Sequence, residues 1–97
     1  MAEVMVRIPQ PLRKLTGGIA EVQIAAETVM QLIENLDKKH PGLRERLVDE
    51  TGNLRKFVNV YLNDEDIRFL NNLNSTIKDG DEVSILPAIA GGSAIKS

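Results

Sequence analysis

The sequence predicts a two-layer α+β domain, in which one main helix packs across one face of a mixed β-sheet. Near both ends of the chain, apolar residues alternate with polar ones, whereas in the middle they recur at helical spacing. The chain has 97 residues, enough to bury one core but not two. We therefore expect a single domain over residues 1–90, followed by a flexible C-terminal tail over residues 91–97.

Two N-terminal strands are predicted by alternation. Residues 4–8, VMVRI, place apolar side chains at every second position, and the prolines that follow end the strand. Residues 20–24, AEVQI, repeat the pattern after a loop that Gly17 and Gly18 close. The second strand should therefore pair back on the first as a wide hairpin.

A helix is predicted to begin after Thr28, where the apolar period changes. The residues of its apolar stripe are Val29, Leu32, Ile33 and Leu36. Thr28 and Gln31 have the spacing of a capping box, and the Pro41-Gly42 pair ends the helix. Leu43 and Leu47 then predict a short helical turn over the core.

The C-terminal part predicts further strands. Residues 57–62, FVNVYL, alternate again, the NDED segment over residues 63–66 is predicted to turn, and Ile67 with Phe69 to form a brief edge strand. Residues 73–77 are expected to form another turn. A tight Asp79-Gly80 turn then leads to a last strand with Val83 and Ile85 facing the core. If that strand lies parallel beside the first, the arrangement is a β-grasp fold.

Two stretches, RKFVNVYLNDEDIRF and IKDGDEVSILPAIAGG, together with the order of elements, resemble the ubiquitin-like sulfur carrier proteins of the ThiS/MoaD family. The resemblance covers essentially residues 3–92 and is strongest to the branch that carries sulfur for cysteine synthesis. It implies that an E1-like adenylyltransferase uses ATP to activate the carboxylate of Gly92. A sulfur source then converts Gly92 to a thiocarboxylate, which donates its sulfur to a biosynthetic enzyme such as a PLP-dependent cysteine synthase.

The glycine pair suits that chemistry. A carboxylate that must pass along a narrow channel to reach ATP needs thin backbone behind it, so Ala90 and Gly91 are expected to thread the partner's active site. Five residues, SAIKS, follow Gly92, and an amide carbonyl cannot be adenylated. We therefore expect proteolytic processing between Gly92 and Ser93, by a JAMM-type metalloprotease as the resemblance implies. The rival interpretation is that the tail stays and the glycines are only a flexible chain end.

Composition excludes several classes of function. The formal net charge of -2 provides no basic footprint for nucleic acid, and the absence of cysteine excludes a disulfide framework, a thiolate nucleophile and a cysteine-based metal site. No apolar run is long enough for a signal peptide or a membrane span, so a cytoplasmic protein is expected. His40 stands alone at a predicted helix end, and the NDED segment lacks EF-hand spacing, so neither predicts a metal site.

We expect no bound cofactor and no intrinsic enzyme activity, because no nucleophile and base stand at a diagnostic spacing. The strand alternation directs Phe57, Tyr61 and Leu86 away from the core, with Met5 nearby, which predicts a protein-docking patch. The alternative is that loops or the segment over residues 11–15 cover it.

Two other functions stay open. A ubiquitin-like modifier would use the same activated Gly92 to form isopeptide bonds with lysines of other proteins. An interaction domain with a flexible end would use no chemistry at Gly92 at all.

Overall fold

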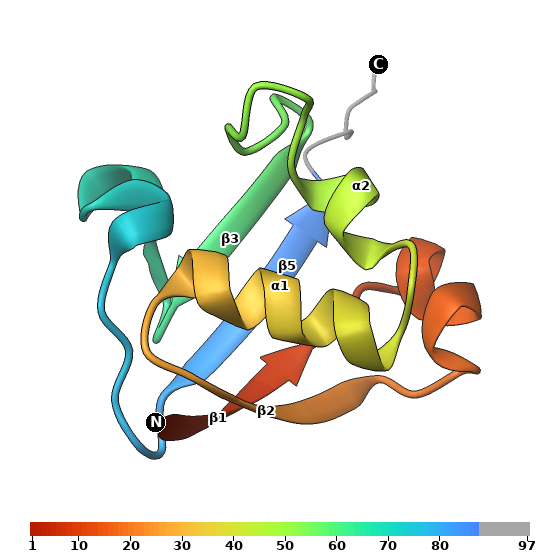
Figure 1. The fold of residues 1–97 in the computed structure, drawn as a ribbon, viewed down its shortest axis with the longest axis horizontal. Helices are drawn as coiled ribbons and strands as arrows, with labels where there is room; N and C mark the ends of the chain where they lie inside the picture. Colours follow the sequence, from red (N-terminus) through yellow and green to blue (C-terminus); the bar gives the residue numbers. More distant parts are fainter. Residues whose placement is uncertain (88–97) are drawn as a thin grey trace.

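The computed structural model describes residues 1–87, in which a five-stranded sheet has the strand order β2-β1-β5-β3-β4 and α1 lies across one face (Figure 1). The strands are β1 (Ala2–Arg7), β2 (Glu21–Ala26), β3 (Val58–Leu62), β4 (Glu65–Asp66) and β5 (Glu82–Pro87). The helices are α1 (Val29–Lys39) and α2 (Leu43–Leu47), with three 3-10 turns, η1 (Gln10–Thr16), η2 (Ile67–Phe69) and η3 (Asn72–Asn74). No helix in this part of the chain has the length and apolar character needed to cross a bilayer.

The central strands carry the β-grasp topology. β1 pairs antiparallel with β2 and parallel with β5, so that Val6 lies opposite Val22 on one side and Val83 on the other. β5 in turn pairs antiparallel with β3, with Ile85 opposite Val60. The predicted hairpin, the parallel first and last strands and the β-grasp fold are therefore confirmed.

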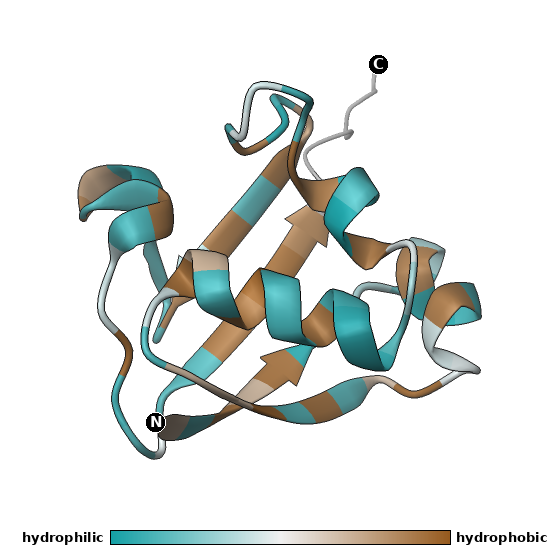
Figure 2. Ribbon diagram, in the orientation of Figure 1, coloured by the Kyte–Doolittle hydropathy of each residue, from teal (hydrophilic) through white to brown (hydrophobic). Residues whose placement is uncertain are grey.

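The core lies between α1 and one face of the sheet. All four residues of the predicted apolar stripe of α1 are buried, whereas Figure 2 shows hydrophilic residues along the outward side of the helix. The inward side chains of the central strands meet them, including Val4, Val6, Val60 and Val83. Removing these apolar surfaces from water is the main source of stability for this packing.

The start of α1 differs slightly from the predicted capping box. The Thr28 hydroxyl oxygen accepts a hydrogen bond from the Gln31 N–H at 3.2 Å, as expected for an N-cap. The Gln31 side-chain oxygen, however, accepts from the N–H of Glu27 at 2.7 Å, one residue before the N-cap. Both side chains still occupy N–H groups at the helix entrance.

The predicted edge strand at Ile67 and Phe69 is wrong. Asn63 and Asp64 make a two-residue turn with positive φ angles of 51° and 73°, and the short edge strand is β4, from Glu65 to Asp66. Ile67 and Phe69 belong to η2, where Ile67 is fully buried and Phe69 is 81% exposed. In a strand, Ile67 and Phe69 would point to the same face. In a 3-10 turn, with three residues per turn, their side chains point in different directions.

Hydrogen bonds attach the start of β5 to its neighbours. Gly80 has a φ of +87°, in the left-handed region that glycine favours, and its N–H donates to the Glu3 carbonyl oxygen at 3.0 Å. The Asp79 carboxylate accepts from the Glu3 N–H at 2.6 Å. The predicted Asp79-Gly80 turn thus connects directly to β1 and helps set the register of the parallel pair.

Candidate functional site

The end of β5 determines where the tail leaves the domain. Pro87 pairs with Val58 at the start of β3, and Figure 1 shows this end of β5 on the side of the molecule opposite the N-terminus. Ala90, Gly91, Gly92 and Ser93 lie outside the described residues, so their threading, sulfur-attachment and processing roles stay predictions. The last described residue nevertheless belongs to a strand held on both edges, by β1 and β3.

The outward faces of β3 and β5 bring Tyr61 and Leu86 together. Leu86 lies opposite Asn59 and Tyr61 lies opposite Ser84, so Tyr61 and Leu86 are diagonal neighbours on the sheet face that α1 does not cover. Tyr61 is half-buried, and Leu86 is 46% exposed. Phe57, directly before β3, is 69% exposed. We call Phe57, Tyr61 and Leu86 the docking patch.

Met5, in contrast, does not adjoin the docking patch. Its partner in β5 is Glu82, whereas the row that contains Tyr61 continues through Ser84 to Arg7. The Arg7 side chain pairs with Glu82 at 2.9 Å. Its hydrogen bond with Glu82 raises the pKa of Arg7 above the ordinary value. A charged pair therefore lies beside Met5 where the sequence pattern alone suggested apolar continuity.

Two hollows flank the docking patch. The first, of about 530 Å³, is lined by Tyr61 and Leu86, and we call it the sheet hollow. The second, of about 240 Å³, is lined by Phe57 and Leu12, and we call it the loop hollow. Pro9 and Ile85 line both hollows, so the two meet close to the end of β5.

The segment over residues 11–15 borders the docking patch. It forms most of η1, and Pro11 and Leu12 contribute one wall of the loop hollow. Phe57 keeps most of its surface exposed beside that wall. The segment therefore shapes the loop hollow and leaves Phe57 largely exposed.

Basic side chains also line the hollows, and the sequence pattern did not predict them. Arg13 lines the sheet hollow, and Arg46 and Arg55 line the loop hollow. They come from η1, from α2 and from the segment before β3, which are far apart in sequence. No periodic pattern connects such positions, so only the folded chain brings them to one surface.

Arg68 is a second residue whose role the sequence did not reveal. Its guanidinium donates to the Asn59 side-chain oxygen at 2.8 Å and to the Val58 carbonyl oxygen at 2.8 Å. A longer bond of 3.3 Å reaches the Arg55 carbonyl oxygen. Arg68 therefore fixes the start of β3 and the adjacent segment that carries Phe57.

The residues considered for metal binding have structural roles. The N–H of His40 donates to the Leu36 carbonyl oxygen at the end of α1. The Asn63 amide donates to the Asp81 carboxylate and accepts from the Glu82 N–H, both at 2.9 Å. Among residues 1–87 no three His, Cys, Asp or Glu side chains are grouped so that they could hold a metal ion.

Comparison with known proteins agrees with this architecture. The model of the ThiS family matches residues 6–92. The chain is 47% identical to the sulfur carrier protein CysO of Mycobacterium tuberculosis (strain ATCC 25618 / H37Rv) over 91 residues, covering 92% of this chain and 98% of that protein. These matches confirm the resemblance that the two quoted stretches predicted.

Solved structures give the same result. A chain in the crystal structure of the BexX/CysO complex of Amycolatopsis orientalis is 47% identical, with a TM-score of 0.87, and the alignment covers 92% of this chain and 99% of that one. The small archaeal modifier protein 1 of Methanosarcina acetivorans is 34% identical, with a TM-score of 0.81 and coverage of 95% and 98%. The family match, the 47% identity over nearly the whole chain and the common fold together show that this chain belongs to the ThiS family.

Proposed function

We propose that the protein is a sulfur carrier that works through a thiocarboxylate on Gly92. The observation that carries this proposal is the 47% identity to a named sulfur carrier, CysO, over 98% of the length of that protein. The folded domain supports it, because Pro87, the last residue of β5, lies five residues before Gly92 in the sequence. The protein is then a co-substrate on which other enzymes act.

The proposed chemistry uses the terminal carboxylate as a handle. An oxygen of the Gly92 carboxylate attacks the α-phosphate of ATP on an E1-like adenylyltransferase, which forms the acyl adenylate and releases pyrophosphate. A sulfur nucleophile delivered by the sulfur source attacks the carbonyl carbon, and AMP leaves. The resulting thiocarboxylate is anionic near neutral pH and reacts through sulfur, as a thiolate does.

Processing is required before that chemistry. The family match ends at residue 92, and residues 93–97 follow it in this sequence. We propose that a JAMM-type metalloprotease hydrolyses the peptide bond between Gly92 and Ser93. Hydrolysis adds water across that bond and leaves a free carboxylate on Gly92.

The docking patch is proposed to hold the partner while the tail occupies its active site. The complex of BexX and CysO from Amycolatopsis orientalis shows that a CysO protein of the same fold binds a second protein. In this chain Phe57 and Leu86 offer exposed apolar surface next to the end of β5. Docking there would leave the tail at the partner's surface.

The proposed acceptor is a biosynthetic enzyme that makes cysteine. Support comes from the likeness to CysO over nearly the whole chain. A PLP-dependent synthase would combine the thiocarboxylate sulfur with an activated serine. Thiamine and molybdopterin synthesis are the competing destinations, because other branches of the family resemblance lead to them.

A protein modifier is the second candidate. The small archaeal modifier protein 1 of Methanosarcina acetivorans matches 95% of this chain, which favours testing this function directly. The activated Gly92 carbonyl would then be attacked by a lysine amine of another protein, with AMP as the leaving group. Detection of this chain in isopeptide linkage to lysines would support the modifier.

Intact mass of the protein from its native cells tests the carrier. Replacing oxygen by sulfur adds the same nominal mass as oxidising one of the three methionines, so mass is compared before and after a thiol-alkylating reagent. The chain has no cysteine, so an alkylated species that ends at Gly92 would demonstrate both processing and the thiocarboxylate.

A matched control is the chain with Gly92→Ala, expressed in the same cells. We expect it to take up no alkylating reagent, because the added methyl group hinders threading through the partner. An unreactive wild-type protein that still ends at Ser97 when sulfur is in demand would contradict the proposal. An interaction domain without chemistry at Gly92 would then be the better description.

A further inference from the structure

Arginines without carboxylate partners surround the two hollows. Arg13, Arg46 and Arg55 line them, yet within residues 1–87 none of the three has a carboxylate oxygen within the 4.0 Å limit of an ion pair. Arg7, which also lines the sheet hollow, pairs with Glu82 and Glu21. No ion pair within residues 1–87 therefore involves the other three guanidinium groups, although the charge of Arg55 acts on nearby Asp49.

The backbone holds two of these arginines in place. The Nε–H of Arg13 donates to the Ile8 carbonyl oxygen at 3.0 Å, and the Nε–H of Arg55 donates to the Glu45 carbonyl oxygen at 2.7 Å. Such a bond uses one edge of the guanidinium and leaves its terminal N–H donors, which form a fork suited to a carboxylate. The positions of these groups are thus set before any partner binds.

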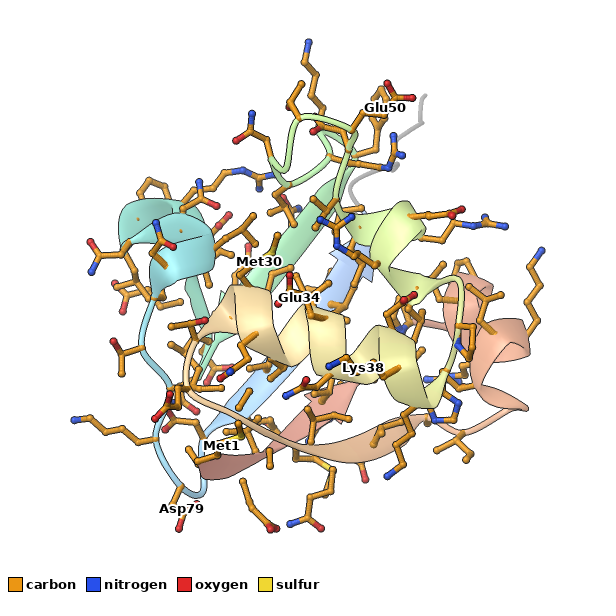
Figure 3. All side chains as sticks on the ribbon, in the orientation of Figure 1. Met1, Met30, Glu34, Lys38, Glu50 and Asp79 are labelled. Atoms are coloured by element: carbon orange, nitrogen blue, oxygen red, sulfur yellow. The ribbon has the colours of Figure 1, made fainter. Side chains whose placement is uncertain are left out.

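Acidic residues are distributed differently. Among the described residues, Asp64 is the one acidic residue that lines the sheet hollow, and none lines the loop hollow. Glu45, Asp49 and Glu50 line a neighbouring hollow together with Arg55. Several more carboxylates, including Asp79, Asp81 and Glu82, lie around the start of β5, and Figure 3 shows Asp79 beside Met1, far from Glu50.

Arginines therefore gather around the two hollows although the net charge of the chain is small and negative. The formal charge of -2 would by itself repel an acidic partner weakly. The arginines that line the two hollows would attract such a partner to the end where β5 terminates. Charge would thus orient the carrier with the tail toward its partner.

We infer that the two hollows dock an acidic surface of the E1-like adenylyltransferase, with carboxylates of that enzyme bound by Arg13, Arg46 and Arg55. The inference rests on the proposed function. It adds that the partner's docking surface is acidic. Phe57 and Leu86 supply the apolar centre of the contact, and the arginines form its charged rim.

The test is steady-state adenylation of the chain that ends at Gly92 by the adenylyltransferase from the same cells, followed by pyrophosphate release. Arg46→Glu is the main variant, since the Arg46 side chain makes no hydrogen bond within residues 1–87. Lys38→Glu on α1 and Lys78→Glu before β5 are the controls, because they change the charge equally at exposed sites outside both hollows.

At an ionic strength of about 0.05 M we expect Arg46→Glu to raise KM for the carrier about fivefold, with kcat unchanged. Arg13→Glu should act in the same direction, and the double variant should exceed either single one. At about 0.5 M salt the difference should shrink below twofold, because screening weakens exposed charge pairs. The lysine controls should stay within twofold throughout, and thermal melting of each variant verifies that it folds.

Several outcomes would overturn the inference. Equal effects of Arg46→Glu and Lys38→Glu would mean that only net charge matters. A lower KM for Arg46→Glu would mean that the arginines bind the chain's own terminal carboxylate. If the wild-type chain self-associates and Arg46→Glu abolishes this, the surface binds a second copy of the chain instead. If the wild-type chain is not adenylated, both the proposed function and this inference fail. If it is adenylated normally and Arg46→Glu has no effect, only this inference fails.

Discussion

The guanidinium of Arg68 donates hydrogen bonds to three acceptors around the start of β3, on Asn59, Val58 and Arg55. Two of these acceptors are backbone carbonyl oxygens, which would otherwise depend on water. The planar fork of arginine can reach acceptors in different directions, whereas a lysine ammonium on a flexible stem cannot reproduce that geometry. The single side chain thereby stabilises the segment that presents Phe57.

Arg68→Lys should therefore lower the free energy of unfolding by about 1–2 kcal/mol, because it loses several hydrogen bonds, of which the one to the Val58 carbonyl oxygen is partly buried. Urea denaturation followed by circular dichroism measures the change. Arg46→Lys is the matched control, since Arg46 makes no side-chain hydrogen bond within residues 1–87 and should stay within about 0.5 kcal/mol of wild type. Equal losses in both variants would refute the role assigned to Arg68.

Asp49 should make stability depend on acid pH. A hydrogen bond from the Thr51 hydroxyl, and a further one from the Asn53 N–H, lower the pKa of Asp49 below its ordinary value of 3.8. A carboxyl whose pKa is lower in the folded state contributes stability above the unfolded pKa. That contribution is lost as the pH falls through the folded pKa.

Asp49→Asn should therefore flatten the loss of stability below about pH 4, because the variant has no carboxylate to protonate at this position. Urea midpoints at a series of pH values measure the slope. Glu50→Gln removes a neighbouring carboxylate without these hydrogen bonds and should keep the wild-type slope. Identical slopes for wild type and Asp49→Asn would contradict the expectation.

Among the elements, those that span many residues were predictable from the sequence, whereas the shortest ones were not. The stripe of α1 and the alternation of β1, β2, β3 and β5 each extend over enough residues to separate a period of 3.6 from one of 2. β4 has two residues and η2 has three, too few for any period. Ile67 and Phe69 were consequently assigned to one strand face, although burial separates them.

The surface around the tail was predictable only in part. Alternation identified the outward direction of Tyr61 and Leu86, because both belong to long strands. It could not exclude Met5, since the separating Arg7–Glu82 pair depends on register between distant strands. The register of a sheet follows from pairing in three dimensions, which a single sequence does not contain.

The β3–β4 hairpin offers a test at this scale. Both central residues of its turn, Asn63 and Asp64, have positive φ, the conformation of a type I′ turn, which favours glycine at the second central position. Asp64→Gly should raise the free energy of unfolding by about 0.5 kcal/mol by relieving strain.

Asn63→Gly is the comparison in the same turn. It removes the two hydrogen bonds of 2.9 Å that connect the Asn63 side chain to Asp81 and Glu82, so it should cost about 1–2 kcal/mol. Thermal denaturation of the two variants under one condition measures the difference. A loss of similar size in Asp64→Gly would show that the turn type is not what limits stability.

For the whole molecule, stability and docking should depend on different faces. The core lies between α1 and the sheet, whereas Tyr61 and Leu86 of the docking patch lie on the other sheet face. Leu86→Ala should leave the unfolding midpoint nearly unchanged, because Leu86 is 46% exposed. Affinity for the E1-like adenylyltransferase should fall about fivefold, the usual scale for an apolar contact residue. Tyr61→Ala should reduce affinity in the same direction.

Phe69→Ala controls for the loss of a surface apolar side chain. Phe69 is 81% exposed in η2 and lines neither hollow. Its replacement should change neither affinity nor stability appreciably. Isothermal titration calorimetry measures the affinities. Unchanged binding by folded Tyr61→Ala and Leu86→Ala variants would remove the docking patch from the proposal.

The parallel pairing of β1 and β5 has a practical consequence for attaching this protein to a solid support. Because both strands run in the same direction, the chain enters the sheet at one end and β5 finishes at the other (Figure 1). A biotin or a sensor chip coupled at Met1 would therefore hold every molecule by the face remote from Pro87. Surface-based kinetics could then be recorded with uniform orientation and without a label near the end of β5.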